Sequence, residues 1–201
     1  CRVSWEGLAQ RLQQHEERED KDGPLWSPTK YAPNTYRCNQ GVLSIDAAVG
    51  DFDDGASWEE VCERLDQYEY VAHSTYSCEP EHPKFRVVIP FTRSVQRDEW
   101  PLIKARIDKH VFGLTCDPAA KDASRVYFLP SCPPGAMRFS VHHKGAMLDP
   151  LALPGVPGNG IAGDVHTDGV HLPLGKAALG FVANGAPVGE QRMAAVAAAR
   201  N

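Results

Sequence analysis

The 201-residue sequence has no apolar run long enough to cross a membrane, and no secretory signal peptide opens it. Its six cysteines form neither a CxxC pair nor a zinc-finger spacing. These absences predict a reduced, cytoplasmic protein without a membrane partner. Positive charge is not in excess either. With a net charge of −5, any contact with nucleic acid has to come from a local basic patch.

Common nucleotide-binding and hydrolase motifs are also missing. The sequence contains no glycine-rich loop of the Walker or dinucleotide-binding kind and no GxSxG nucleophile elbow. None of the histidines, among them His73, His82 and the pair at 142–143, has a second ligand at metal-binding spacing. We therefore interpret the histidines as surface or packing residues.

The periodicity of apolar residues predicts a mixed domain followed by a linker. Helices are expected at 4–17, 57–68 and 97–112, and strands at 42–53, 68–77 and 84–91, with a further strand around residue 127. Glycine and proline dominate after about residue 145, where periodicity ends. The predicted organisation is a domain over 1–145, a linker over 146–172, and the truncated start of a helical segment over 173–201.

The stretch "VGDFDDG" at 49–55 crowds carboxylates at the end of a predicted strand. Two carboxylates about 4 Å apart repel by roughly 4 kcal/mol at an effective dielectric near 20, so another group has to offset the repulsion. Alternation along the strand places Asp51 and Asp53 on one face and Phe52 on the other. A divalent cation bound by oxygen ligands is one explanation. The alternative is an acidic turn before a helix, in which Ser57 is the N-cap and Glu60 its capping-box partner.

Basic residues occur on the strand predicted at 84–91. In "KFRVVIPF", Lys84 and Arg86 share one face, opposite the packing residues, and arginine suits bidentate binding of phosphate. The alternative is an exposed sheet face, and the remaining charges up to residue 109 are typical of a solvated helix. Asp117 is either a third metal carboxylate or a turn residue before Pro118. Arg125 and Tyr127 share a face of the last predicted strand.

The run "GDFDDG … AHSTYSCEPEHPKFRVVIPFTRSV … CDPAAKDASRVYFLPS" resembles the catalytic domain of primase-polymerases of the archaeo-eukaryotic primase superfamily, over about residues 1–140. This resemblance implies an α+β fold with a largely antiparallel sheet of the RNA-recognition-motif type, an N-terminal α/β unit and a short helical tail. It also implies catalytic Mg²⁺ or Mn²⁺. The metal ligands implied are Asp51, Asp53 and Asp117, and the nucleotide-binding residues are Ser74, Thr75, Ser77, Lys84, Arg86 and Arg125.

The activity that the resemblance implies is template-directed nucleotidyl transfer, as a DNA primase or polymerase of a phage or mobile element. Its expected partners are a single-stranded DNA template, a primer, dNTPs or NTPs, and a helicase domain of the full-length protein. The sequence departs from the family at Cys78, where relatives commonly carry histidine. Two alternatives stay open: a two-metal nuclease, and a catalytically inactive primase-like module that only binds nucleic acid.

Overall fold

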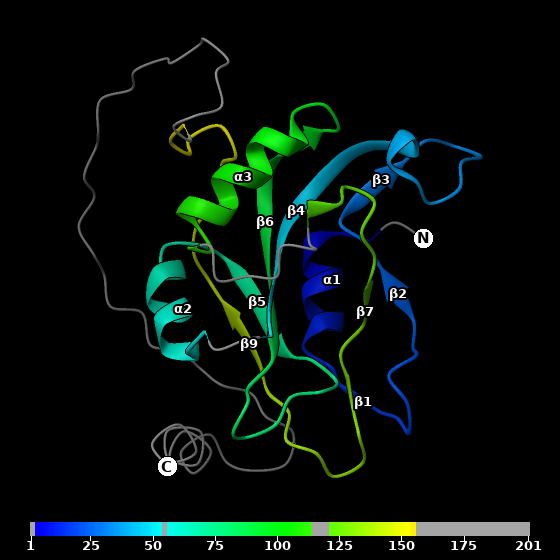
Figure 1. Cartoon of the computed structure of the whole chain (residues 1–201), viewed down its shortest axis with the longest axis vertical. Coiled ribbons are helices and arrows are strands. Elements are labelled where there is room, and N and C mark those ends of the chain that lie inside the picture. The colour runs from blue at the N-terminus through cyan, green and yellow to red at the C-terminus, as the bar shows by residue number, and fades with distance from the viewer. Residues whose placement is uncertain (1–2, 54–55, 114–120, 156–201) are drawn as a thin grey trace.

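A five-stranded sheet forms the centre of the computed structural model, which describes residues 3–53, 56–113 and 121–155 (Figure 1). Neighbouring strands of this sheet are all antiparallel, in the order β3 (Thr29–Tyr31), β4 (Val42–Phe52), β6 (Phe85–Gln96), β5 (Tyr70–Ser74) and β9 (Ser140–His143). The helices are α1 (Trp5–Leu12), α2 (Trp58–Leu65) and α3 (Trp100–His110), with a 3-10 turn η1 (Asn39–Gly41). Two short ribbons pair β1 (Glu16–Glu17) with β8 (Ser131–Cys132) and β2 (Leu25–Trp26) with β7 (Tyr127–Phe128).

The order of elements confirms the predicted fold class. The chain runs β4, α2, β5, β6, α3, and β4 and β5 lie on either side of β6. This is the arrangement of a split βαββα unit, as in RNA-recognition-motif sheets. An N-terminal unit of α1 and short strands precedes it. The predicted helical tail lies outside the described residues.

Local sequence signals account for the helix starts. Ser57 is the N-cap of α2, as predicted, and its hydroxyl accepts a hydrogen bond from the Glu60 amide at 3.1 Å. Ser4 caps α1 in the same way through the Gly7 amide. The helices and strands predicted between residues 4 and 112 are present, although all three helices are shorter than the sequence pattern suggested.

The sheet buries a hydrophobic core on each face. On one face, α2 and α3 pack against strand residues that include Phe52, Phe85 and Val87. On the other face, α1 and β7 pack against a smaller group that includes Val49 and Val88 (Figure 1). Alternation along β4 and β6 then places Asp51 and Arg86 on the second face, beside Val49 and Val88.

Contacts with the sheet continue past residue 145. The Leu148 amide donates to the Pro90 carbonyl at 2.9 Å, and the Thr92 amide donates to the Leu148 carbonyl at 3.0 Å. Leu148 and Leu153 are both buried in the core beneath α3. The linker predicted from residue 146 thus begins with a segment packed on the domain, because these leucines cover apolar surface that α3 leaves open. Residues 156–172, and the predicted tail at 173–201, lie outside the described residues.

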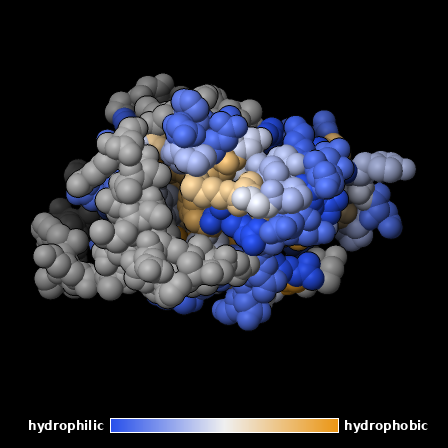
Figure 2. Space-filling view, turned by 90° about the horizontal axis from the view of Figure 1, so that it is seen from below, coloured by the Kyte–Doolittle hydropathy of each residue, from blue (hydrophilic) through white to orange (hydrophobic). Residues whose placement is uncertain are grey.

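One end of the molecule carries mostly polar residues among those that the structure describes (Figure 2). The end view in Figure 2 is largely hydrophilic, with one small hydrophobic area near its middle. Among residues 3–53, 56–113 and 121–155, none of the helices combines the length and the apolar character that crossing a bilayer requires.

Two leucines three positions apart test whether the segment after residue 145 stabilises the domain. Leu148 is 1% exposed and Leu151 is 58% exposed. We expect Leu148→Ala to lower the free energy of unfolding by about 2–5 kcal/mol, because it opens a cavity in the core. Leu151→Ala is the matched control and should change it by less than about 0.5 kcal/mol. Urea denaturation measures both. Equal effects of the two substitutions would contradict the packing of this segment.

Candidate active site

The candidate site is built on an ion pair between neighbouring strands. Asp51 of β4 and Arg86 of β6 are direct partners in the antiparallel register. The Arg86 Nε atom donates to the Asp51 Oδ1 atom at 2.5 Å. The side chain of Asp51 is only 7% exposed and that of Arg86 only 15%, so water screens the attraction weakly. The negative charge of Asp51 is therefore balanced by a guanidinium within the protein.

Two further groups hold the Arg86 guanidinium from the β7 side. Its Nη1 atom donates to the Phe128 carbonyl at 3.3 Å, and its Cζ atom lies 4.6 Å from the centre of the Tyr127 ring, as in a cation–π contact. Burial raises the pKa of Tyr127, and the Asp51 carboxylate raises it further, so the phenol stays protonated at neutral pH. Tyr127 is supported in turn by Trp26, with 5.4 Å between ring centroids.

On the other side of Arg86 lies a buried histidine. His73 of β5 pairs with Arg86 in the strand register and is 1% exposed. Burial, and secondarily the positive charge of Arg86, lowers the pKa of His73 to about 3. Its Nδ1 atom lies 3.0 Å from the Ser74 carbonyl, and its Nε2 atom has no hydrogen-bond partner. His73 is therefore a neutral packing residue, as the sequence suggested, beside the charged pair.

The predicted nucleotide-binding residues between β5 and β6 differ in accessibility. The Ser74 hydroxyl is buried and used within the fold, because it contacts His15 Nε2 at 3.0 Å and accepts from the Phe139 amide at 3.1 Å. Thr75 is half-buried and Ser77 is exposed, so these two hydroxyls are more open to a ligand. Cys78, where the family commonly carries histidine, is buried, and burial raises the pKa of its thiol.

Two of the other predicted site residues, Asp53 and Lys84, flank the strands that carry the ion pair. Asp53 follows β4 directly and is exposed, and Lys84 precedes β6 and is half-buried. Asp117 lies outside the described residues. The structure thus brings Asp51 and Arg86 into contact and leaves the roles of Asp53, Lys84 and Asp117 as predictions.

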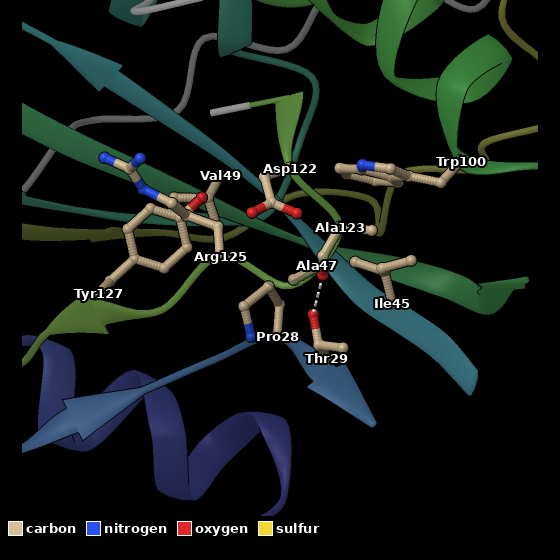
Figure 3. A pocket seen from close by; sticks show the side chains of 10 residues that line it. All are labelled: Pro28, Thr29, Ile45, Ala47, Val49, Trp100, Asp122, Ala123, Arg125 and Tyr127. Carbon is tan, nitrogen blue, oxygen red and sulfur yellow. Dashed lines mark hydrogen bonds between the residues drawn. The ribbon is translucent and has the colours of Figure 1, made fainter. Parts of the chain in front are cut away.

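A small pocket beside the ion pair holds Arg125 (Figure 3). Arg125 and Tyr127 line it together with Ala47 and Val49 of β4. The predicted strand begins only at Tyr127, so Arg125 lies in the segment that leads into β7. The segment that carries Arg125 is fixed by a turn. In that turn, Asp122 accepts from the Ser124 amide at 3.0 Å. Arg125 is thus placed on the same face as Arg86.

Sequence reasoning missed two members of this arrangement. The sequence pattern predicted that Tyr127 lies on a strand but not that its ring contacts Arg86. It gave no sign that the Phe128 carbonyl accepts from Arg86. An aromatic residue two positions after Arg125 was the available clue to a cation–π contact. The carbonyl could not have been found, because its place depends on β7 crossing over the sheet.

Oxygen ligands on a strand end fit a hard divalent cation such as Mg²⁺ or Mn²⁺. Within the described part of the chain, however, no three histidine, cysteine, aspartate or glutamate side chains are grouped to hold a metal ion. Asp51 and Asp53 supply two carboxylates in the described residues, and Asp117 is the predicted third. The carboxylate oxygens of these residues suit such a metal ion. In the structure, Asp51 contacts the positively charged guanidinium of Arg86.

Comparison with known proteins gives the family. The model of the VapE N-terminal domain matches residues 35–153, and the chain belongs to this family. Among solved structures, the AEP domain of the primase-polymerase of cyanophage S-2L matches with a TM-score of 0.41 and 20% sequence identity. The match covers 59% of this chain and 65% of that domain. No curated protein sequence matches the chain.

The ion pair between Asp51 and Arg86 can be tested by a double-mutant cycle. We expect Arg86→Met to lower the free energy of unfolding by about 3 kcal/mol, because it leaves the buried Asp51 carboxylate without its cation. Adding Asp51→Asn should recover part of this loss, because the unpaired charge is then removed. Glu63→Gln, on the exposed side of α2, is the control for loss of one charge. Additive costs of the two site substitutions in urea denaturation would contradict the pairing.

Stability should also depend on pH through His73. Its folded-state pKa is about 3, below the unfolded value near 6.5, so the unfolded chain binds the proton more readily between these values. Stability contributed by the neutral ring is thus complete above about pH 6.5 and is lost as the pH falls. His15, also lowered in pKa by burial, acts in the same direction.

We expect His73→Leu to flatten the fall in unfolding free energy between pH 6.5 and 4.5, a window above the ordinary pKa of carboxylates. The slope removed should be at most about 1.4 kcal/mol per pH unit. The exposed His82 provides the control substitution, His82→Leu, which should leave the slope unchanged. Identical slopes for wild type and His73→Leu would show that His73 titrates normally in the folded state.

Proposed function

We propose that this domain catalyses template-directed nucleotidyl transfer, as a primase or polymerase in the replication of a phage or mobile element. The observation that carries the proposal is the buried contact between Asp51 and Arg86 at the end of β4, with Arg125 on the same face. A carboxylate suited to a divalent cation and arginines suited to phosphate are the two chemical halves of such a site. The motif order in the sequence supports the same function.

Asp51, Asp53 and Asp117 would hold Mg²⁺ or Mn²⁺ in this site. When bound, these cations lower the pKa of the primer 3′-hydroxyl and stabilise the leaving pyrophosphate. The buried position of Asp51 gives it a fixed direction, since β4 and β6 pair through the whole stretch from Ala47 to Phe52. Such a preorganised ligand needs little rearrangement at the moment of reaction.

Arg86 would exchange partners when substrate binds. In the structure its Nε atom is held by Asp51, while the Tyr127 ring and the Phe128 carbonyl hold the guanidinium from β7. Asp51 would then hold the cation, and the edge of Arg86 that now contacts Asp51 would bind a triphosphate oxygen while the β7 contacts keep the guanidinium in place. Lys84 and Arg125 would bind the remaining phosphate charge. Thr75 and Ser77 offer accessible hydroxyl donors in the loop before β6.

Two other functions are compatible with parts of this site. A two-metal nuclease would use the same carboxylates but would degrade the strand rather than extend it. A primase-like binding module would bind nucleic acid without turnover. Extension by nucleotidyl transfer is favoured over both, because a phosphate-binding arginine in direct contact with a metal-type carboxylate serves the triphosphate of an incoming nucleotide. A helicase domain in the full-length protein remains part of this proposal.

A primer-extension assay tests the proposed function. The full chain is incubated with a labelled primer on a single-stranded template, dNTPs or NTPs, and Mg²⁺ or Mn²⁺. We expect metal-dependent extension, lost almost completely in Asp51→Asn. Arg125→Ala should weaken nucleotide affinity at least tenfold while template affinity changes less than twofold, because in this proposal its guanidinium binds the triphosphate.

Controls separate the alternatives in the same experiment. Leu151→Ala, on an exposed position far from the site residues in sequence, should extend the primer like wild type. Shortening of the labelled strand would identify a nuclease. Binding of the primed template without any change in the length of the labelled primer, with either cation and either nucleotide, would identify an inactive binding module.

A further inference from the structure

The most exposed large apolar side chain in the described part of the chain is an aromatic one. Tyr36 is 91% exposed, whereas the next, Leu151, is 58% exposed. An aromatic ring displayed so fully loses the hydrophobic stabilisation that burial would give it. The proposed chemistry at Asp51 makes no use of this residue. Its exposure therefore calls for a separate explanation.

The loop that carries Tyr36 is firmly built. The Thr35 hydroxyl donates to the Ala32 carbonyl at 2.7 Å, and the Ala32 amide donates to the Gly41 carbonyl at 2.8 Å. A Cβ atom at Gly41 would lie 2.9 Å from the Thr35 Oγ1 atom and 3.2 Å from the Tyr36 carbonyl oxygen, so the two arms of the loop are in close contact. The outward position of the Tyr36 ring thus follows from an anchored backbone.

Positively charged side chains lie on this loop, on the strand that precedes it and just after β6. Arg37 is exposed, and its Nε atom donates to the Ser124 carbonyl at 2.8 Å. Arg97 is exposed and donates through Nη1 to the Gln40 carbonyl at 3.0 Å. Lys30 of β3 is exposed as well. Each arginine uses one nitrogen to brace the loop and has further donors for a ligand. Against these three cations stands the exposed Asp98, so the patch is positive in a chain whose net charge is −5.

The Tyr36 loop connects directly to the segment that forms the candidate site. The Ser124 carbonyl accepts from Arg37 and also from the Tyr31 hydroxyl, at 2.9 Å. The Ser124 amide donates to Asn39 Oδ1 at 3.2 Å. Ser124 is the residue before Arg125 in the pocket and three before Tyr127, whose ring lies against Arg86. The loop of Tyr36 and the segment of Arg125 are therefore joined by hydrogen bonds through Ser124.

We propose that Tyr36, with Lys30, Arg37 and Arg97, binds single-stranded nucleic acid. The ring would stack on an unpaired base, and the three cations would contact the flanking phosphates. A duplex is a poorer ligand, because its bases are already stacked and paired. An exposed aromatic ring on a loop that two arginines contact also fits a polyanion with flat bases better than it fits a protein surface. That the bound strand is the template rests on the proposed function, whereas the binding itself does not.

The test is direct binding of labelled oligo(dT) to the full chain, measured by fluorescence anisotropy in EDTA without nucleotide. We expect Tyr36→Ala to weaken binding of a long oligonucleotide at least fivefold. Tyr36→Phe keeps the ring and should stay within twofold of wild type. Leu151→Ala removes another exposed apolar side chain and should have no effect. Thermal melting should be the same for all of these proteins, since the Tyr36 side chain packs on almost nothing.

The contribution of the positively charged side chains is measured by the salt dependence of binding. Lys30→Gln and Arg97→Gln should each reduce the slope of log K against log salt by about 0.7, the value for one phosphate contact on a single strand. Tyr36→Ala should leave this slope unchanged, because the ring neutralises no phosphate. Wild-type affinity in Tyr36→Ala, unchanged slopes in both cation variants, or no binding by the wild-type chain would overturn the proposal.

Failure of this proposal can be told apart from failure of the proposed function. If primer extension depends on Asp51 but binding is unaffected by Tyr36→Ala, the strand is bound elsewhere and only the Tyr36 surface is wrong. If oligonucleotide binding depends on Tyr36 but no cation supports extension, the binding surface stands and the catalytic proposal fails.

Discussion

The contact between Asp51 and Arg86 is the constraint around which the candidate site is arranged. A carboxylate and a guanidinium this buried are stable only as a pair, because either charge alone would cost several kcal/mol to desolvate. The pair in turn requires β4 and β6 to keep their register, since a shift by one residue would turn Asp51 to the opposite face. The contacts of Arg86 with Tyr127 and Phe128 then fix how β7 lies over the sheet.

The rest of the domain serves to hold this register. One face of the sheet is sealed by α2 and α3, and the other is covered by α1 and β7 only in part. The proposed site lies on the second face, where the pairing of β4 with β6 keeps Asp51 and Arg86 in position. The anchored loop around Tyr36 extends the same principle, because its exposed ring is carried by a backbone with little freedom to move.

Sequence patterns predicted the elements better than the contacts between them. Alternation in "KFRVVIPF" correctly separated Arg86 from the packing residues Phe85 and Val87. The cap at Ser57 was correct too, because capping depends on residues three positions apart. From the sequence alone, the crowded carboxylates around Asp51 could be interpreted only as a metal site or as an acidic turn. The guanidinium partner of Asp51 lies 35 positions away and meets it only through the pairing of β4 with β6.

By itself, the sequence determined which residues alternate, where helices begin and which side chains carry charge, since these properties depend on near neighbours along the chain. Only the tertiary structure decided which charges meet. Arg86 contacts Asp51 because an antiparallel register brings two distant strands together, and Leu148 is buried because the segment after β9 returns to Pro90. It also decided that Tyr36 stays exposed beside the segment of Arg125. Long-range pairing of this kind depends on how the whole core packs, and no local pattern encodes it.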